Sequence, residues 1–306
     1  AFSNRHYVTV SNGTERSKTT VSAGYQNENG ILINSWFKRF SGKLTNTFKV
    51  NSRVELNTSL AYNNAKESRY DDYGVGGMTA TRTMIECFPL LPVRYANGRY
   101  SKFADFKYPS TLTEAGNPVY NERGEKMVDY NNLGAFWGYA DNPVQQAFDF
   151  QRKLTTDQVL GNAELSVKII DGLVFRANGA VEAKWSRENR YTGVDLVEFS
   201  SGGANAYIGN TNHVYWQSEN FLTYDKKWGD HKLNAMVGAS WNGAQSQSLA
   251  GSGQGYTSDF FTWNNLGLAE KPGIPYSNFT EWRMNSYYFR GNYSYANKYL
   301  ATVSMR

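Results

Sequence analysis

The sequence lacks most of the residues on which disulfide, metal and helical-membrane assignments depend. A single cysteine, Cys87, excludes an internal disulfide. The histidines, His6, His213 and His231, do not have metal-ligand spacing to each other. No apolar run reaches about 18 residues, and the mean hydropathy is −0.60, which excludes a helical membrane protein. A membrane-spanning β-barrel stays open, because its strands are only half apolar.

Features typical of enzymes and of nucleic-acid-binding proteins are also scarce. The net charge of +5 comes without a run of Lys and Arg interleaved with aromatic residues, so we expect no nucleic-acid partner. The glycines at 251, 253 and 255 precede no expected helix and are not a dinucleotide-binding loop. Asp71-Asp72 lacks the ligand spacing of a calcium loop. No local arrangement of Ser, His and Asp suggests a nucleophile, so we predict no catalytic residue, metal or cofactor.

A long hairpin between Gln158 and Arg187 carries the clearest pattern in the chain. Its apolar residues alternate with polar ones, as in Ala163, Leu165, Val167 and Ile169 against Asn162, Glu164, Ser166 and Lys168. The alternation resumes at Leu173. A three-residue turn that pairs Ile169 with Leu173 would keep both apolar sets on one face, with Gly172 in the left-handed conformation.

The length of this alternation separates two architectures. Strands of soluble sandwiches usually stop at about five or six residues and turn their apolar face inward. Crossing a bilayer at a tilt takes about 9–11 residues, and a transmembrane barrel turns its apolar face toward lipid. The alternation in this hairpin lasts about twice as long as a usual strand, which favours the barrel.

Connection lengths support the same interpretation. Short turns are expected around Asn12-Gly13-Thr14, Asn51-Ser52-Arg53, Ile170-Asp171-Gly172, Trp228-Gly229-Asp230 and Ala296-Asn297-Lys298. Long connections are expected at Lys66–Gln151, Asn189–Asn212 and Gln247–Met284, with that of about 85 residues at 66–151 forming an extracellular insertion. Short periplasmic turns alternating with long outer loops are what an up-and-down outer-membrane barrel requires.

Aromatic residues make up 15% of the chain and suggest two roles. Trp36, Tyr62, Trp185, Trp216 and Trp241, toward the outer ends of strands, and Trp228 in a short turn suggest interfacial girdles. The candidate substrate-binding residues lie in the long connections and are Phe136, Trp137, Tyr139, Asp141, Trp263 and Trp282. Their aromatic rings suit the C–H faces of sugars, while packing within the loops themselves is an equally good explanation for any one of them.

The amino-acid sequences of the strands resemble those of the SusC/RagA-like TonB-dependent transporters of Bacteroidetes outer membranes. The segments that carry the resemblance are Trp36-Phe37-Lys38-Arg39-Phe40-Ser41, Asp141-Asn142-Pro143, Leu160-Gly161-Asn162-Ala163-Glu164-Leu165, Asp171-Gly172-Leu173-Val174-Phe175-Arg176, Glu219-Asn220-Phe221-Leu222-Thr223-Tyr224-Asp225, Trp228-Gly229-Asp230-His231-Lys232-Leu233-Asn234-Ala235 and Tyr288-Phe289-Arg290-Gly291-Asn292-Tyr293. Each segment alone is weak, but their order and spacing together cover nearly the whole chain.

The resemblance implies a 22-stranded barrel in the Gram-negative outer membrane that imports a large nutrient, mostly an oligosaccharide and in some members a peptide. It also implies a SusD-like surface lipoprotein as a partner and the TonB complex as the energy source. About ten strands are expected here, so residues 1–306 would be the N-terminal part of the barrel domain, with the plug, the TonB-contacting segment and the terminal strands outside it. Glu55, Asn57, Glu164, Arg176 and Glu182 would face the wet interior.

Two other functions remain open at this point. A soluble all-β glycan-binding or glycan-degrading protein would bury the face that carries Leu56, Val167 and Val237 against a second sheet. A passive porin or adhesin barrel would share the lipid-facing pattern without the coupling to TonB.

Overall fold

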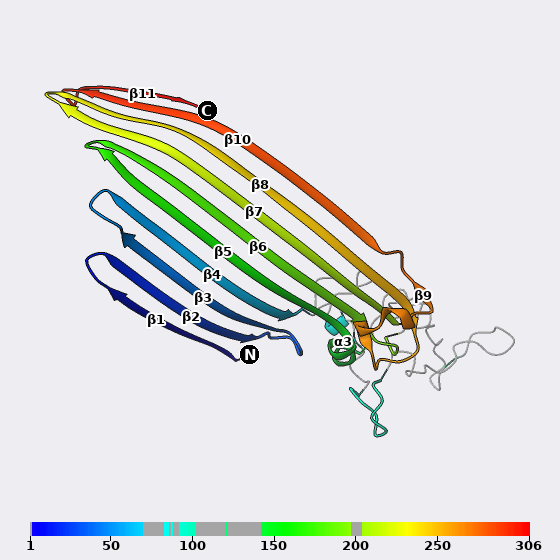
Figure 1. Ribbon diagram of the computed structural model, residues 1–306. Coiled ribbons are helices and arrows are strands. Elements are labelled where there is room, and N and C mark those ends of the chain that lie inside the picture. Colours follow the sequence, from blue (N-terminus) through cyan, green and yellow to red (C-terminus); the bar gives the residue numbers. More distant parts are fainter. Residues whose placement is uncertain are drawn as a thin grey trace.

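A computed structural model of the chain describes residues 2–69, 83–85, 87, 92–101, 120, 142–196 and 204–306. These residues form one antiparallel sheet in which each long strand pairs with the next (Figure 1). The strands are β1 (Ser3–Gly13), β2 (Ser17–Asn29), β3 (Trp36–Lys49), β4 (Val54–Ser68), β5 (Phe150–Ile170), β6 (Leu173–Thr192), β7 (Ala204–Trp228), β8 (His231–Tyr256), β10 (Tyr276–Tyr295) and β11 (Tyr299–Met305), with the two-residue β9 (Lys271–Pro272) beside β8. The predicted all-β, up-and-down architecture is confirmed.

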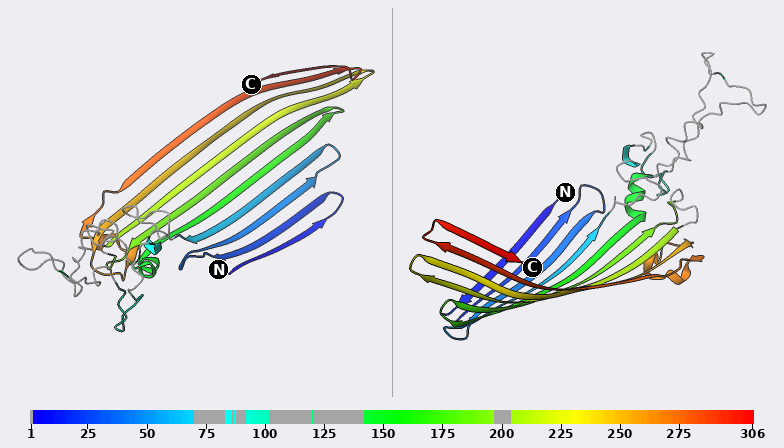
Figure 2. Two further views of the ribbon diagram at one scale, coloured as in Figure 1. Left: turned by 180° about the vertical axis from the view of Figure 1, so that it is seen from behind. Right: turned by 90° about the horizontal axis from the view of Figure 1, so that it is seen from above.

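The sheet is open and curved, and β1 and β11 are its two edges (Figure 2). All the short turns lie at one end, at the upper left of Figure 1. The opposite end carries the helix α3 (Pro143–Asp149), β9 and the 3-10 turns η5 (Thr262–Asn264) and η6 (Leu266–Leu268). The predicted separation of short turns from long connections is therefore confirmed. None of the described helices is long and apolar enough to cross a membrane.

The central hairpin keeps its predicted faces through a different turn. Ile170, not Ile169, pairs with Leu173, and the register shifts between Lys168 and Ile170. The turn therefore has two residues, with Gly172 left-handed at φ 84° as predicted. The turn is one residue shorter than predicted, and a β-bulge puts one extra residue into β5. The two changes cancel, so the apolar sets of both strands still lie on the same face. The predicted pairing of Ile169 was wrong.

The strands run further into the long connections than alternation predicts. β4 continues to Ser68 and β5 begins at Phe150, inside the expected 66–151 insertion. β8 and β10 likewise extend to Tyr256 and from Tyr276, so most of the expected 247–284 connection is strand. Beyond the bilayer both faces of a strand meet water, so the backbone ladder persists while the alternation that would reveal it disappears.

The apolar face of the sheet is exposed to its surroundings. Leu60, Leu165, Val181 and Val237 are 52%, 36%, 46% and 54% exposed. Partner strands place them on a common face through the rows Leu60–Gly161–Val181 and Leu56–Leu165. Among the described residues no second sheet covers this face, which contradicts the soluble-sandwich alternative. An exposed apolar band of this size needs lipid as its solvent.

The band has the thickness and slope expected of a bilayer crossing. On β4 it spans Val54 to Tyr62, nine residues, and ends at Asn64. Tyr62 marks the outer boundary of the band on β4, and direct strand pairing connects it with Gln245 of β8, four strands away. The aromatic residue that marks this boundary on β8 is Trp241, which lies four residues closer to the short turns than Gln245. A drift of one residue per strand, at ~3.3 Å against a strand spacing of ~4.8 Å, corresponds to a tilt of about 35°. Transmembrane barrel strands tilt by this amount.

Two alanines on β6 allow a direct test of the two faces. Replacing Ala177, the row partner of Leu165, by Arg puts a charge near the middle of the lipid-facing band and should cost about 2–4 kcal/mol of insertion free energy. The amount of folded full-length protein in outer membranes, measured by heat-modifiable gel mobility, should fall. Ala180→Arg, which points to the opposite face, is the control and should assemble normally. Equal assembly of the two variants would contradict the assignment of the faces.

Candidate substrate path along the inner wall

Polar side chains recur on the face opposite the apolar band, which we call the inner wall. Asn57 pairs with Glu164 across β4 and β5, and both lie on this face as predicted. Between β5 and β6, Gln158 Nε2 donates to Glu182 Oε1 at 2.7 Å. Asn162 Nδ2 donates to Asn178 Oδ1 at 2.9 Å. Such pairs satisfy polar groups along the wall and leave their remaining donors and acceptors to water or a solute.

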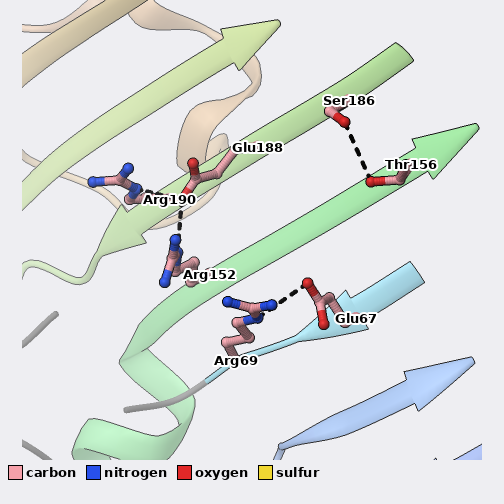
Figure 3. A network of polar contacts seen from close by, with 7 residues as sticks. All are labelled: Glu67, Arg69, Arg152, Thr156, Ser186, Glu188 and Arg190. Carbon is pink, nitrogen blue, oxygen red and sulfur yellow. Dashed lines mark hydrogen bonds and ion pairs between the residues drawn. The ribbon is translucent and has the colours of Figure 1, made fainter. Parts of the chain in front are cut away.

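Charged side chains gather where this wall leaves the bilayer (Figure 3). Glu188 Oε1 accepts from Arg152 Nε at 2.6 Å and from Arg190 Nε at 2.7 Å. Burial by itself would raise the pKa of the Glu188 carboxyl, but the hydrogen bonds from Arg190 and Arg152 outweigh it, so this pKa lies below its usual value. Glu188 therefore stays ionised at neutral pH and links β5 to β6.

Two aromatic rings stand on the same wall further along the sheet. Trp282 of β10 and Tyr215 of β7 have ring centroids 6.2 Å apart at an interplanar angle of 46°. Tyr215 Oη donates to Gln217 Oε1 at 2.8 Å. Trp282 is 46% exposed and lies five residues beyond Tyr287, outside the band. These side chains offer an aromatic surface next to hydrogen-bonding groups.

The outer rim is held together on the opposite, outward face of the strands. Its core consists of Tyr191, Ala204, Ala206, Tyr256 and Trp263. Tyr191 Oη donates to Asp259 Oδ1 at 2.8 Å, which fixes the β8–β9 connection to the end of β6. Burial, together with this hydrogen bond, raises the pKa of the Tyr191 hydroxyl, so the hydroxyl keeps its proton.

The two predicted binding residues that the structure describes, Trp263 and Trp282, lie on opposite faces of the sheet. Phe136, Trp137, Tyr139 and Asp141 lie outside the described residues. Trp263 is 8% exposed, and Lys153 Nζ lies 5.1 Å from its ring centroid on the outward side of the strands. Of the predicted residues that the structure describes, Trp282 alone faces the inner wall, and it lies in β10 rather than in a loop.

Sequence reasoning missed Tyr215, Glu188 and the two arginines that Glu188 binds. Tyr215 sits between Val214 and Trp216, so the alternation of β7 already places it on the polar face. Its contact with Trp282, two strands away, depends on a register that only the structure supplies.

The aromatic girdles are present, with two corrections. At the turn end Trp228 stacks on His231 at 5.5 Å, and His231 lies 4.8 Å from Tyr295. At the outer boundary Trp241 contacts Tyr287 edge-on at 6.5 Å. Trp36, however, is level with Ser68, six residues beyond Tyr62, and Trp185 is level with Asn64. These last two tryptophans stand outside the bilayer.

Comparisons with known proteins point to one family. No protein-family model matches the chain. The chain is 26% identical over 316 residues to the TonB-dependent receptor SusC of Bacteroides thetaiotaomicron, covering all of this chain and 29% of that protein. It is 23% identical to TonB-dependent receptor P3 of Formosa agariphila over 98% of this chain and 27% of that one. The chain is SusC-like over its whole length. Its open sheet matches part of a TonB-dependent transporter barrel.

Solved structures support the fold of this SusC-like segment. The structure of the RagAB peptide transporter matches 99% of the chain with a TM-score of 0.70 at 18% identity, and the segment covers 31% of that chain. A ferripyoverdine receptor of the outer membrane of Pseudomonas aeruginosa matches with a TM-score of 0.50 at 14% identity. The segment spans less than a third of the curated relatives, whose names describe receptors rather than enzymes. Its place is the outer membrane.

Glu188 provides a test of how the rim is held. Glu188→Gln removes a charge that accepts from two arginines, and such hydrogen bonds are worth about 1.5–3 kcal/mol. Amide hydrogen exchange at 150–156 and 186–192, measured on the purified full-length protein, should speed up by roughly tenfold. Glu281→Gln breaks the exposed Glu281–Arg283 pair (2.7 Å) and should change little. Equal effects would contradict the account.

The same contact predicts a pH dependence. Because the pKa of Glu188 is lowered in the folded state, its stabilisation is present at neutral pH. It should be lost as pH falls below the ordinary carboxyl pKa of about 4.3 and through the folded-state value. After correction for intrinsic rates, exchange at 150–156 should rise in the wild type over that range and stay flat in Glu188→Gln. A rise of the same size in both would show that another group titrates.

Proposed function

We propose that the chain forms part of the wall of an outer-membrane TonB-dependent importer of a large nutrient. The observation that carries the proposal is the two-faced sheet: a lipid-facing apolar band about nine residues long behind an inner wall with hydrogen-bonded polar side chains. A wall of this kind encloses water and can pass a polar solute. Similarity to receptors named TonB-dependent supports energised import over a passive porin.

An oligosaccharide is the substrate class that we propose. The inner wall presents amides, carboxylates and hydroxyls, together with the Tyr215–Trp282 pair, and sugars need both kinds of contact. A peptide is the alternative class, since the RagAB structure that matches the fold is titled a peptide transporter. Transport needs differential binding and gating rather than a nucleophile, so no covalent step is required.

The remaining parts of the machine are proposals too. A SusD-like surface lipoprotein would cap the outer end, and the TonB complex would act through segments of the whole protein beyond this chain. We place the 66–151 segment, apart from its strand ends, outside the cell. Within it, α3 lies against the outer ends of the strands, where Ala147 packs with Leu32 and Phe150. Phe136, Trp137, Tyr139 and Asp141 would contact substrate there. For Trp263, substrate contact stays a prediction.

The test is uptake by cells that carry the full-length transporter. A deletion strain complemented with the wild-type gene should accumulate fluorescent oligosaccharides, and loss of TonB or of the proton gradient should abolish accumulation. Deleting the gene for the SusD-like partner should lower uptake at low substrate concentration. Uptake that persists without TonB would identify a passive porin, and uptake of peptides alone would replace the substrate class.

A further inference from the structure

The two aromatic residues of the inner wall share a floor. Tyr215 of β7 and Trp282 of β10 are both direct row partners of Ala244 on β8, which lies between them. Ala244 is only 6% exposed although its strand face is the inner wall. With ring centroids 6.2 Å apart, both rings reach over this small residue and cover it. A larger side chain at 244 would separate them.

The rings are unequal in their exposure. Tyr215 is partly buried, and its hydroxyl is occupied by Gln217. Trp282 is 46% exposed, and β11 pairs with β10 only from Phe289 to Tyr295, so part of this exposure lies along the open edge of the sheet. Trp282 lies beyond the bilayer band and on the inner-wall face of β10, so its indole is turned away from lipid. An exposed indole on a rigid strand is a preformed stacking surface that loses little conformational entropy on binding.

Hydrogen-bonding groups flank this surface in the same row. Glu182 is the direct partner of Tyr215 across β6 and β7. One of its oxygens, Oε1, accepts from Gln158 Nε2 at 2.7 Å, which holds the carboxylate in place. A carboxylate has about four acceptor positions, so it can also accept from hydroxyl groups of a bound molecule. Gln217, whose Oε1 accepts from the Tyr215 hydroxyl, adds an amide that has N–H donors.

The charge around the rings favours a neutral ligand. From β5 to β10, Glu182 is the charged member of the row that contains Tyr215, Ala244 and Trp282. Lys43 of β3 lies in the same row, three strands from Glu182. Lys184 lies in the next row outward, opposite His213, so one cation roughly balances one anion. The charged neighbours of Trp282 on its own strand, Glu281 and Arg283, project to the outward face and pair with each other. The row has no cluster of cations that would recognise a carboxylated or sulfated sugar.

We propose that Trp282, Tyr215 and Glu182 form a subsite for consecutive neutral hexopyranose units of an oligosaccharide, at the entrance of the importer. Glu182 and Trp282 stand three strand spacings of ~4.8 Å apart, so the apolar C–H face of one sugar ring stacks on the indole while hydroxyls of a neighbouring unit donate to the Glu182 carboxylate. The subsite rests on the proposed function, since it matters only if a solute passes along this wall. It narrows the substrate from oligosaccharides in general to uncharged ones.

Binding to the purified full-length transporter tests the subsite. The probes are maltoheptaose, cellohexaose and xylohexaose as neutral sugars, a hexamer of galacturonic acid as an acidic sugar, and a mixture of ten-residue peptides. Isothermal titration should detect binding of at least one neutral sugar. Trp282→Ala should weaken it about tenfold, the loss expected for one stacking ring and its buried area, and Trp282→Phe should restore most of it. Glu182→Gln should weaken it less.

Phe279→Ala is the matched control. Phe279 is 55% exposed on the same strand, three residues from Trp282, but it lies on the outward face. Its removal should leave binding unchanged, and heat-modifiable mobility should show that all variants assemble. Unchanged binding in Trp282→Ala overturns the subsite. Wild-type binding to acidic sugars or peptides alone, or to none of the probes, overturns it as well.

Uptake separates a failure of the subsite from a failure of import. The same variants are assayed in cells with and without TonB. TonB-dependent uptake of peptides or acidic sugars that is insensitive to Trp282→Ala would leave the proposed import intact and remove the subsite. Loss of TonB dependence in the wild type would contradict import itself.

Discussion

The structure depends on how backbone hydrogen bonds are satisfied inside a bilayer. Each unpaired N–H or C=O in hydrocarbon costs several kcal/mol, so a chain of this composition can cross only as strands that pair with one another. From β1 to β11 each long strand pairs antiparallel with the next, and the register shifts at Lys168/Ile170 and at Ala204/Asn205 leave this pairing intact. With the backbone paired in this way, the side chains are free to differ between faces. Lipid then selects apolar groups on one face, and water and solute select polar groups on the other.

This constraint also explains where the functional groups lie. Inside the band the polar face carries hydrogen-bonded pairs such as Asn162–Asn178, which smooth the wall without a concentrated charge. Charged and aromatic contacts lie beyond the band, where Glu188 accepts hydrogen bonds from two arginines and the Trp282 ring packs near that of Tyr215. The rim needs such contacts because its strands have no lipid on one side to hold them. Its small apolar core around Tyr191 and Trp263 serves the same purpose.

Much of the fold could be predicted from the sequence because lipid imposes a period of two. Val54 to Tyr62 and Ala163 to Val167 show that period, and their faces are as expected. The strand ends could not be predicted, because water on both faces of residues such as Ser68 or Gln254 removes the period while the ladder continues. The pairing of Ile169 was predicted wrongly because a two-residue turn with a bulge and a three-residue turn without one put the same residues on each face.

The site was harder to predict than the fold because it is made between strands. Trp282 was identified as a candidate, but its assignment to a loop was wrong, since it lies on β10. The approach of Tyr215 needs the register of three strands and a small residue, Ala244, between them. Trp263 has the same residue type in a comparable connection, yet it packs on the outward side beside Lys153. Residue type alone could not separate the two tryptophans.

The measurement that tests the two-faced wall most directly is a spin-label scan along β5. Single cysteines are placed from 158 to 167 in the full-length protein, with Cys87 replaced by Ser, and each label is probed with oxygen and with a water-soluble nickel complex. Labels at Val159, Ala163, Leu165 and Val167 should prefer oxygen, and those at Gln158, Asn162, Glu164 and Ser166 should prefer nickel. Uniform accessibility, or low accessibility to both probes at the apolar positions, would contradict the account.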